Sequence, residues 1–265
     1  METQIFDRQW ETFTVTHADH IAELTFNRPD KLNAMSRTMR LELGDFFLDL
    51  ARETEVHCLI VTGAGRAFSA GGDINDFSAT PEEMHDLMGR ISHRWFKAFW
   101  ALPQIVVVAV NGIAAGGGAN LALGGDIVIA AEGAAFAQTF QKIGLVPDLG
   151  GAFLLPRLVG PQRAKEMALL GDKISAKDAY QMGLVNRIVP AEQLMTEARA
   201  LANRIAAISP KAVTLTKRMM NRSFEQSMES TLDHEWMAQS FLFGTAESKE
   251  GVAAFINKSS KARGD

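Results

Sequence analysis

The stretch IVVVAVNGIAAGGGANLALGGDIVIA, residues 105–130, decides the fold. It begins with a continuous apolar run, 105–110, which is typical of a strand buried on both faces of a sheet. A glycine-rich turn, a short helical segment and a second apolar run at 127–130 follow. This succession of strand, glycine turn, helix and strand predicts an α/β protein.

The composition is that of an ordinary soluble globular protein. The 265 residues are 47% hydrophobic and 22% charged, with a formal net charge of -4. An acidic chain has no general attraction for nucleic acid or anionic membranes, so neither is expected as a partner. The uncharged stretch from Phe99 to Gly125 contains Pro103 and six glycines, which argues against a membrane-spanning helix. The opening METQIFDRQWETF does not resemble a signal peptide, so a cytoplasmic location is expected.

The segments on either side of the central stretch extend the α/β pattern. Apolar runs predict strands at 13–17, 21–26, 57–62 and 184–189. Apolar residues at helical spacing predict helices at 36–54, 81–101, 191–206 and 210–258. Ser175 and Asp178 form a start resembling a capping box, and Gly183 a stop, for a further short helix. The chain therefore becomes mostly helical after Gly151.

Two glycine clusters, AGGD at 70–73 and AGGG at 115–118, each follow a predicted strand. Glycine lets the backbone approach a ligand closely, and a helix N-terminus presents N–H groups without partners. Two such N–H groups that meet at one point would form an oxyanion hole. The glycines could equally serve only to pack helices tightly on strands, and their spacing leaves both interpretations open.

Asp148 is the one carboxylate in IGLVPDLGG, residues 143–151. It could cap or hold a turn before a helix that begins near Leu149 or Gly150, because Pro-Asp commonly opens a turn. It could also be a catalytic base. The residues alone favour the cap.

Other kinds of site find little support in the sequence. The six histidines are scattered without the spacing of metal ligands, so no metal is expected. The motif GAGRAF resembles a dinucleotide-binding turn but has Phe68 where the third glycine belongs. Cys58 is the only cysteine, which excludes an internal disulfide.

Five collinear segments resemble the crotonase (enoyl-CoA hydratase/isomerase) superfamily. They are LTFNRPDKLNAM, LIVTGAGRAFSAGGDINDF, VVVAVNGIAAGGGANLALGGDIVIAA, FQKIGLVPDLGGAFLLPRLVG and EGVAAFINK, which together run from residue 24 to 258. The resemblance implies a spiral of ββα units that binds the acyl-CoA in residues 1–200, followed by a helical trimerisation region in 201–265. It also implies homotrimers, or dimers of trimers. Coenzyme A would be part of the substrate, so no separate cofactor is expected.

The resemblance also assigns roles to single residues. Gly72 and Gly117 fall at the two positions whose N–H groups hold the thioester oxygen. The adenine would be recognised by backbone groups of Ala70, Asp73 and Ile74. Three basic residues would lie near CoA phosphates, on this chain or a neighbouring subunit: Arg28, Lys31 and Lys258.

The carboxylates present separate this chain from ordinary hydratases of the superfamily. Those enzymes use two glutamates, whose positions are here occupied by Asn120 and Phe140. Asp148 falls where several isomerases of the superfamily, including proteins similar to 1,2-epoxyphenylacetyl-CoA isomerase, carry their catalytic acid. The resemblance therefore implies an isomerase of unsaturated or epoxide-bearing acyl-CoA in which Asp148 moves a proton. An apolar wall of Phe140, Leu145, Val146 and Leu149 is expected to raise its pKa.

Three alternatives remain. The first is hydration with Asp148 as the sole acid and base. The second is a nucleophilic carboxylate of the dehalogenase kind, which is disfavoured because that chemistry usually has a tryptophan where this chain has Phe140. The third is a non-catalytic member that binds RNA, which the acidic net charge and the lack of an arginine-rich patch disfavour.

Overall fold

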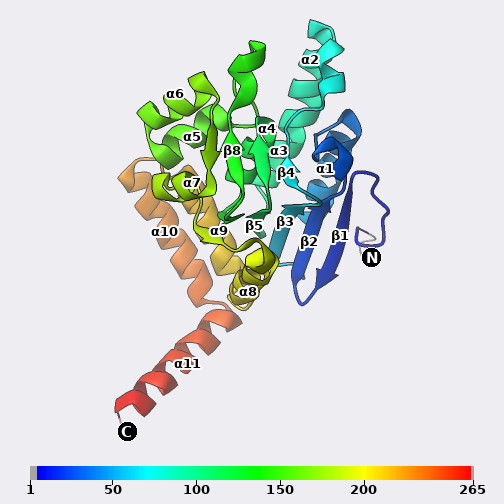
Figure 1. Cartoon of the computed structure of the whole chain (residues 1–265). Coiled ribbons are helices and arrows are strands. Elements are labelled where there is room, and N and C mark those ends of the chain that lie inside the picture. Colours follow the sequence, from blue (N-terminus) through cyan, green and yellow to red (C-terminus); the bar gives the residue numbers. More distant parts are fainter. Residues whose placement is uncertain (1–4, 264–265) are drawn as a thin grey trace. The chain divides into compact units, whose positions relative to one another are not determined.

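The computed structural model describes residues 5–263, and the side chains of residues 77–78 and 257–263 lie outside that description. The chain divides into two compact units, Met1–Ile205 and Ala206–Asp265. The first unit contains two β-sheets with their helices, and the second contains helices (Figure 1).

The larger sheet of the first unit has the strand order β1-β2-β3-β5-β7-β10. Its strands are β1 (Phe13–Ala18), β2 (Ile21–Phe26), β3 (Cys58–Gly63), β5 (Ile105–Val110), β7 (Ile127–Ala131) and β10 (Arg187–Val189). The β1–β2 pair is an antiparallel hairpin, and every later pairing in this sheet is parallel. Every residue of β3 and β5 is buried, as the continuous apolar runs predicted.

The second sheet has the order β4-β6-β8-β9. Its short strands are β4 (Ala67–Ser69), β6 (Ile113–Ala115), β8 (Ala135–Ala137) and β9 (Lys173–Ser175). Strands β4, β6 and β8 follow directly on β3, β5 and β7 of the larger sheet, respectively. Strands β3, β5 and β7 pair in parallel with one another, and so do β4, β6 and β8. Each turn of the chain thus lays one strand in each sheet before a helical segment, which confirms the expected spiral of ββα units.

The helical segments of the first unit follow these strand pairs. Its α-helices are α1 (Arg37–Leu50), α2 (Pro81–Asp86), α3 (His93–Trp100), α4 (Gly117–Leu123), α5 (Gly151–Val159), α6 (Pro161–Leu170), α7 (Ala176–Met182) and α8 (Leu194–Ala206). Four 3-10 segments are η1 (Pro29–Lys31), η2 (Ile74–Ser78), η4 (Thr139–Ile143) and η5 (Ala191–Gln193). The helix predicted over 81–101 is interrupted by a π-helical turn, η3 (Leu87–Ser92). Such turns are rare and are often found at functional sites.

The core of the first unit places the functional loops. Helix α1 packs on α3 through buried aromatic side chains, among them Phe47, Trp95 and Phe99. Asp126 has a structural role, because its carboxylate accepts the N–H of Val106 in β5 at 2.7 Å. Every residue of α4 is buried, so the glycine-rich turn before it is fixed from within the core.

The second unit consists of α9 (Pro210–Arg222), α10 (Met228–Phe243) and α11 (Ala246–Arg263). The predicted helical region over 210–258 is therefore three helices. Helix α10 has no buried residue among those described, although it carries large apolar side chains. Trp236, for example, is 74% exposed.

Candidate active site

The two glycine clusters come together in space. A Cβ placed on Gly71 would lie 2.7 Å from the Ala115 carbonyl oxygen and 3.2 Å from the Gly117 nitrogen. Gly71 also has a φ of +92°, which other residues rarely adopt. Glycine at this position therefore allows the loop after β4 to lie directly against the loop after β6.

The N–H groups of Gly72 and Gly117 lie in these two loops. Residues Met35 and Gly72 form an isolated parallel bridge, which uses the N–H groups of Met35 and Asp73 and not that of Gly72. Gly117 is the first residue of α4, where an N–H has no acceptor within the helix. Gly72 and Gly117 thus place two backbone N–H groups on adjoining loops, and neither has a hydrogen-bond acceptor among the described residues, which is the arrangement that an oxyanion hole requires.

Asp148 lies in a tight turn before α5 and is not the N-cap of that helix. The helix begins at Gly151 and its N-cap is Gly150. The Asp148 main-chain carbonyl accepts the Gly151 N–H at 2.8 Å, across Leu149 and Gly150, whose φ values are 41° and 73°. A leucine with positive φ is unfavourable and is found mainly where the surrounding structure enforces it, often at functional sites. The capping interpretation of Asp148 is therefore wrong.

Two buried amides fix this turn. Asn120 on α4 donates from Nδ2 to the Asp148 main-chain oxygen at 2.8 Å. Its Oδ1 accepts a hydrogen bond of 2.8 Å from Gln138 Nε2. A Cβ on Gly151 would lie 2.3 Å from Asn120 Nδ2, so glycine is needed there for the amide to reach the turn. Asn120 thus holds the Asp148 backbone through its Nδ2, while Gln138 fixes the other side of the Asn120 amide.

The Asp148 carboxylate adjoins the candidate oxyanion hole. Its Oδ1 would lie 3.0 Å from a Cβ built on Gly117, with Met35 Cε at the same distance. This oxygen is buried and has no hydrogen-bond partner among the described residues. Burial raises the pKa of Asp148 to about 6, although the Arg40 guanidinium and the Asp148 main-chain N–H both act to lower it. A carboxylate with such a pKa is suited to exchange protons near neutral pH.

The apolar wall expected around Asp148 is only partly present. Phe140 and Leu149 are buried, but Leu145 and Val146 are 48% and 77% exposed. The segment from Leu145 to Pro147 has no regular secondary structure after η4, which leaves the first two side chains outside the core. Met35 and Leu149 therefore flank the carboxylate beside Gly117.

Asp73 is braced within the loop that follows Gly72. Its carboxylate forms a 2.9 Å ion pair with Arg28 Nη1 and accepts the Asn75 N–H at 3.1 Å as the N-cap of η2. Burial acts to raise the pKa of Asp73, but the Asn75 N–H and Arg28 outweigh it and the pKa is lowered. The Arg28 guanidinium also donates to the Ala34 main-chain oxygen. Arg28 thus holds two loop segments together.

The other predicted binding residues are spread around this loop. Ala70 donates its N–H to the Leu32 carbonyl oxygen at 2.9 Å. Ile74 is 76% exposed at the start of η2, and Lys31 is exposed at the end of η1. Lys258 belongs to α11, but its side chain lies outside the described side chains.

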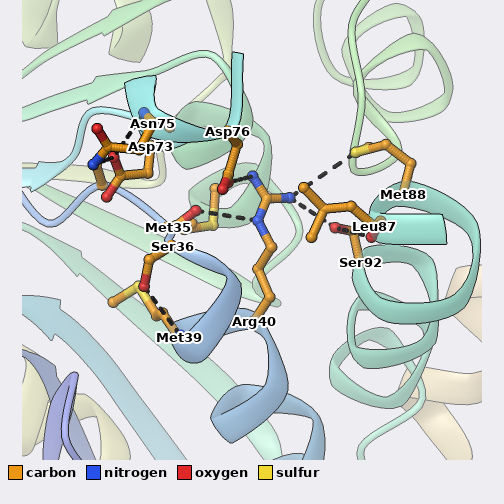
Figure 2. Close-up of polar contacts among 12 residues, drawn as sticks. Met35, Ser36, Met39, Arg40, Asp73, Asn75, Asp76, Leu87, Met88 and Ser92 are labelled. Carbon is orange, nitrogen blue, oxygen red and sulfur yellow. Dashed lines mark hydrogen bonds and ion pairs between the residues drawn. The ribbon is translucent and has the colours of Figure 1, made fainter. Parts of the chain in front are cut away.

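A buried arginine near the site was not predicted from the sequence. Arg40 lies on the buried face of α1 with Leu43 and Phe47. Figure 2 shows its guanidinium between Met35 and Asp76 on one side and Ser92 and Met88 on the other. The sequence does contain a signal for this residue. Arg40 lies at helical spacing from apolar residues that face the core, where a charged side chain is unusual.

No metal site or membrane span accompanies these residues. Over residues 5–263, no group of three or more His, Cys, Asp or Glu residues is arranged to hold a metal ion. None of the helices in that range is both long enough and apolar enough to cross a membrane.

Comparison with known proteins identifies the family. The chain matches the model of the enoyl-CoA hydratase/isomerase family over residues 16–263, and it belongs to that family. It is accordingly an enzyme that acts on acyl-CoA. The crotonase superfamily membership expected from the five motifs is confirmed.

Relatives within the family differ in their named reactions. The chain is 39% identical over 253 residues to 1,2-epoxyphenylacetyl-CoA isomerase of Escherichia coli (strain K12), covering 94% of this chain and 97% of the relative. It is 34% identical over 250 residues to crotonyl-CoA hydratase of Syntrophomonas wolfei, with coverages of 94% and 96%. The structure of enoyl-CoA hydratase from Bacillus anthracis superposes with a TM-score of 0.90 at 33% identity, covering 94% of this chain and 97% of that one.

Proposed function

We propose that the protein isomerises an unsaturated or epoxide-bearing acyl-CoA, with Asp148 as the single proton carrier. The observation that carries this proposal is the buried, unpartnered Oδ1 of Asp148 beside Gly117. The similarity to 1,2-epoxyphenylacetyl-CoA isomerase supports it.

The proposed chemistry begins at C2 of a 3-enoyl thioester. The ionised Asp148 removes a proton from C2, and the electron pair moves onto the thioester oxygen to give a dienolate. The N–H groups of Gly72 and Gly117 stabilise this oxyanion, and one such donor contributes about 3 kcal/mol to the transition state. The dienolate then takes the proton back from Asp148 at C4, and the double bond lies between C2 and C3. The carboxylate is regenerated, so no second acid is needed.

Hydration is the second candidate, because several relatives are named enoyl-CoA hydratases. Its chemistry needs groups that hold and activate a water molecule. Both hydrogen-bonding sides of the Asn120 amide already engage the protein, one with Asp148 and one with Gln138. Phe140 offers no polar atom in its side chain. These two positions support isomerisation over hydration.

The binding of CoA is proposed to use the loop around Asp73. The backbone of Ala70, Asp73 and Ile74 would recognise the adenine, and the exposed Lys31 would approach the phosphates. Arg28, already paired with Asp73, would act by fixing that loop. Lys258 remains a proposed contact to the CoA of a neighbouring subunit.

We also propose a homotrimer, or a dimer of trimers, that forms through the helical unit. Large apolar side chains on α10 are exposed in the single chain, including Trp236, Phe241 and Phe243. Such a surface marks an interaction site. Sedimentation equilibrium tests the assembly, and a monomer at micromolar concentration would contradict it.

The activity is tested by offering 3-enoyl-, 2-enoyl- and epoxide-bearing CoA thioesters to the wild type and to Asp148→Asn. We expect turnover of a 3-enoyl or epoxide substrate that is lost in the variant. Hydration of the 2-enoyl substrate as the dominant wild-type activity would favour the second candidate. Full activity of Asp148→Asn on every accepted substrate would remove Asp148 from the mechanism.

A further inference from the structure

Arg40 is a buried cation that the chemistry proposed above does not use. Its side chain is 4% exposed, and it is one of the few charged residues in the core of the described chain. Burial lowers the pKa of its guanidinium, while Asp148, Asp76 and Asp73 act to raise it. A buried charge is tolerated when it is paired and hydrogen-bonded, so the partners of Arg40 indicate why it is there.

One edge of the guanidinium supports the oxyanion loop. Arg40 Nε donates to the Met35 main-chain oxygen at 3.1 Å. The same oxygen accepts the Asp73 N–H at 3.3 Å, and the Met35 N–H donates to the Gly71 carbonyl oxygen at 2.7 Å. Arg40 thus binds Met35, the residue that forms the bridge with Gly72.

The opposite edge is fixed by the π-helical turn (Figure 2). Arg40 Nη1 donates to Ser92 Oγ at 2.7 Å and lies 4.0 Å from Met88 Sδ. The Ser92 hydroxyl in turn donates to the Leu87 main-chain oxygen at 2.8 Å, which spans the turn. The arginine therefore has a fixed position that does not depend on a carboxylate partner.

The nearby carboxylates do not neutralise the Arg40 guanidinium through hydrogen bonds among the described residues. Asp73 is already paired with Arg28. Asp76 approaches Arg40 Nη2 at 3.9 Å, and its buried Oδ2 has no hydrogen-bond partner among the described residues. Asp148 also has a buried oxygen without a hydrogen-bond partner among the described residues, and it shares Met35 as a neighbour with Arg40. Asp148 Oδ1 and Met35 Cε each lie 3.0 Å from a Cβ built on Gly117, and the Met35 main-chain oxygen accepts from Arg40. Among the described residues neither Asp76 nor Asp148 is hydrogen-bonded to the guanidinium, so its charge remains available to both carboxylates.

We propose that Arg40 is a positioning residue that provides the buried counter-charge for the Asp148 carboxylate, and that Met35 and Ser92 hold it there. This inference rests on the proposed role of Asp148 as the base. It assigns to α1 and the π-helical turn a function in the reaction, since both fix the cation. It also gives a reason for the π-helical geometry, which brings the Ser92 hydroxyl to the arginine.

The direction of the effect follows from the charges around Asp148. Without Arg40, burial would act on the carboxyl with less opposition, and its pKa would rise above about 6. Asp76 and Asp73 of the η2 loop face Arg40 as well, so neutralising Asp76 would leave more of the cation's field for Asp148. The two substitutions are therefore expected to move the Asp148 titration in opposite directions.

The test compares Arg40→Met, Arg40→Lys and Asp76→Asn in the full chain, with Arg37→Met as control. Arg37 lies on the same helix, but it is exposed and pairs with Asp86 at the surface. The readout is the carboxyl carbon resonance of Asp148 in protein labelled with ¹³C-aspartate, assigned by its loss in Asp148→Asn. The acidic limb of kcat/KM provides a second readout.

We expect Arg40→Met to raise the Asp148 midpoint by about one pH unit or more, the size of effect that a nearby opposite charge has on a carboxyl group. Arg40→Lys should restore most of the shift, and Asp76→Asn should lower the midpoint. Arg37→Met should leave it within roughly 0.3 unit, since exposed charges are screened. A folded Arg40→Met with an unchanged midpoint would overturn the proposal. If Arg40→Met does not fold, an unchanged or raised Asp148 midpoint in Asp76→Asn would overturn the proposal instead.

The titration needs no substrate, so it separates this inference from the proposed function. If Asp148→Asn keeps full activity while Arg40→Met moves the midpoint, the counter-charge stands and the base assignment fails. If Asp148→Asn is inactive while the midpoint does not respond to Arg40, the base assignment stands and the counter-charge fails.

Discussion

Asp73 and Asp148 lie in two loops on either side of the same glycine pair, and their carboxylates have opposite surroundings. Asp73 accepts hydrogen bonds from Asn75 and forms an ion pair with Arg28, and its pKa is lowered. Asp148 has a buried oxygen without a hydrogen-bond partner among the described residues, and its pKa is raised to about 6. The first carboxylate is bound by Asn75 and Arg28, whereas the second has its own main-chain N–H and one buried oxygen without a partner among the described residues.

The difference distinguishes a structural carboxylate from a reactive one. A carboxylate that is fully hydrogen-bonded in its charged form resists protonation, which suits a residue that shapes a loop. A carboxylate that is buried without donors exchanges its proton near neutral pH, which suits a base that later acts as an acid. The turn at Asp148 is held through its main chain by Asn120, so the Oδ1 oxygen of the carboxylate is not needed to hold the turn.

The largest expected effect is the loss of activity in Asp148→Asn. The variant keeps the size and the main-chain bonds of the turn but cannot take a proton. We expect kcat/KM on the best 3-enoyl or epoxide substrate to fall by about 10²- to 10⁴-fold, the usual contribution of an acid-base residue. Steady-state kinetics measure it, and Asp126→Asn, at a half-buried carboxylate that binds the Val106 N–H, tests whether the loss of another hydrogen-bonded carboxylate has the same result.

The same substitution is expected to stabilise the fold at neutral pH. Because the pKa of Asp148 in the folded protein lies above its ordinary value of 3.8, the Asp148 carboxyl group destabilises the folded state as the pH rises from about 4 to 6. A shift of this size corresponds to about 2–3 kcal/mol. The stability difference between Asp148→Asn and the wild type, from urea unfolding, should therefore be small near pH 4 and reach its full value above pH 6. A difference that does not vary with pH would contradict the raised pKa.

Asp73 should show the opposite behaviour. Its lowered pKa means that its carboxylate contributes stability above the ordinary aspartate pKa, which is lost as the pH falls further. We expect Asp73→Ala to cost roughly 1–3 kcal/mol at pH 7, because the η2 cap and the Arg28 pair are both removed. Asp73→Asn should cost less, since asparagine can still cap. Equal losses in urea unfolding would mean that the cap contributes nothing.

A smaller effect is expected at Gln138, which acts on Asp148 only through Asn120. Gln138→Leu removes the hydrogen bond to Asn120 Oδ1 and leaves the amide free to turn. We expect a loss of about 1 kcal/mol in stability and a fall in kcat of less than ten-fold. The Asp148 titration midpoint should not change, which distinguishes this support of the main chain from the electrostatic role proposed for Arg40.

The fold could be predicted largely from sequence because it depends on local patterns. The apolar runs at 105–110 and 127–130 are strands, and the glycine cluster at 115–118 opens a helix, as expected. The break of 81–101 into a π-helical turn could not be predicted, because local helical spacing does not reveal tertiary contacts such as the one between Ser92 and Arg40.

The site could be predicted only where single residues carry the signal. Local sequence favoured a cap at Asp148, and only the positive φ of Leu149 and Gly150 shows that the turn ends before the helix begins. The exposure of Leu145 and Val146 depends on the path of an irregular segment, which apolar composition does not determine. The engagement of Asn120 with Asp148 and Gln138 joins residues far apart in the chain.

The central claim is that one carboxylate carries a proton from C2 to C4, and transfer of a label tests it most directly. The wild type and Asp148→Asn are given a 3-enoyl-CoA carrying deuterium at C2, in ordinary water, and the product is analysed early in the reaction. We expect a measurable fraction of the wild-type product to carry deuterium at C4, and we expect Asp148→Asn to form almost no product. Wild-type product that carries only solvent protons at C4, or a variant that transfers the label at the wild-type rate, would contradict this claim.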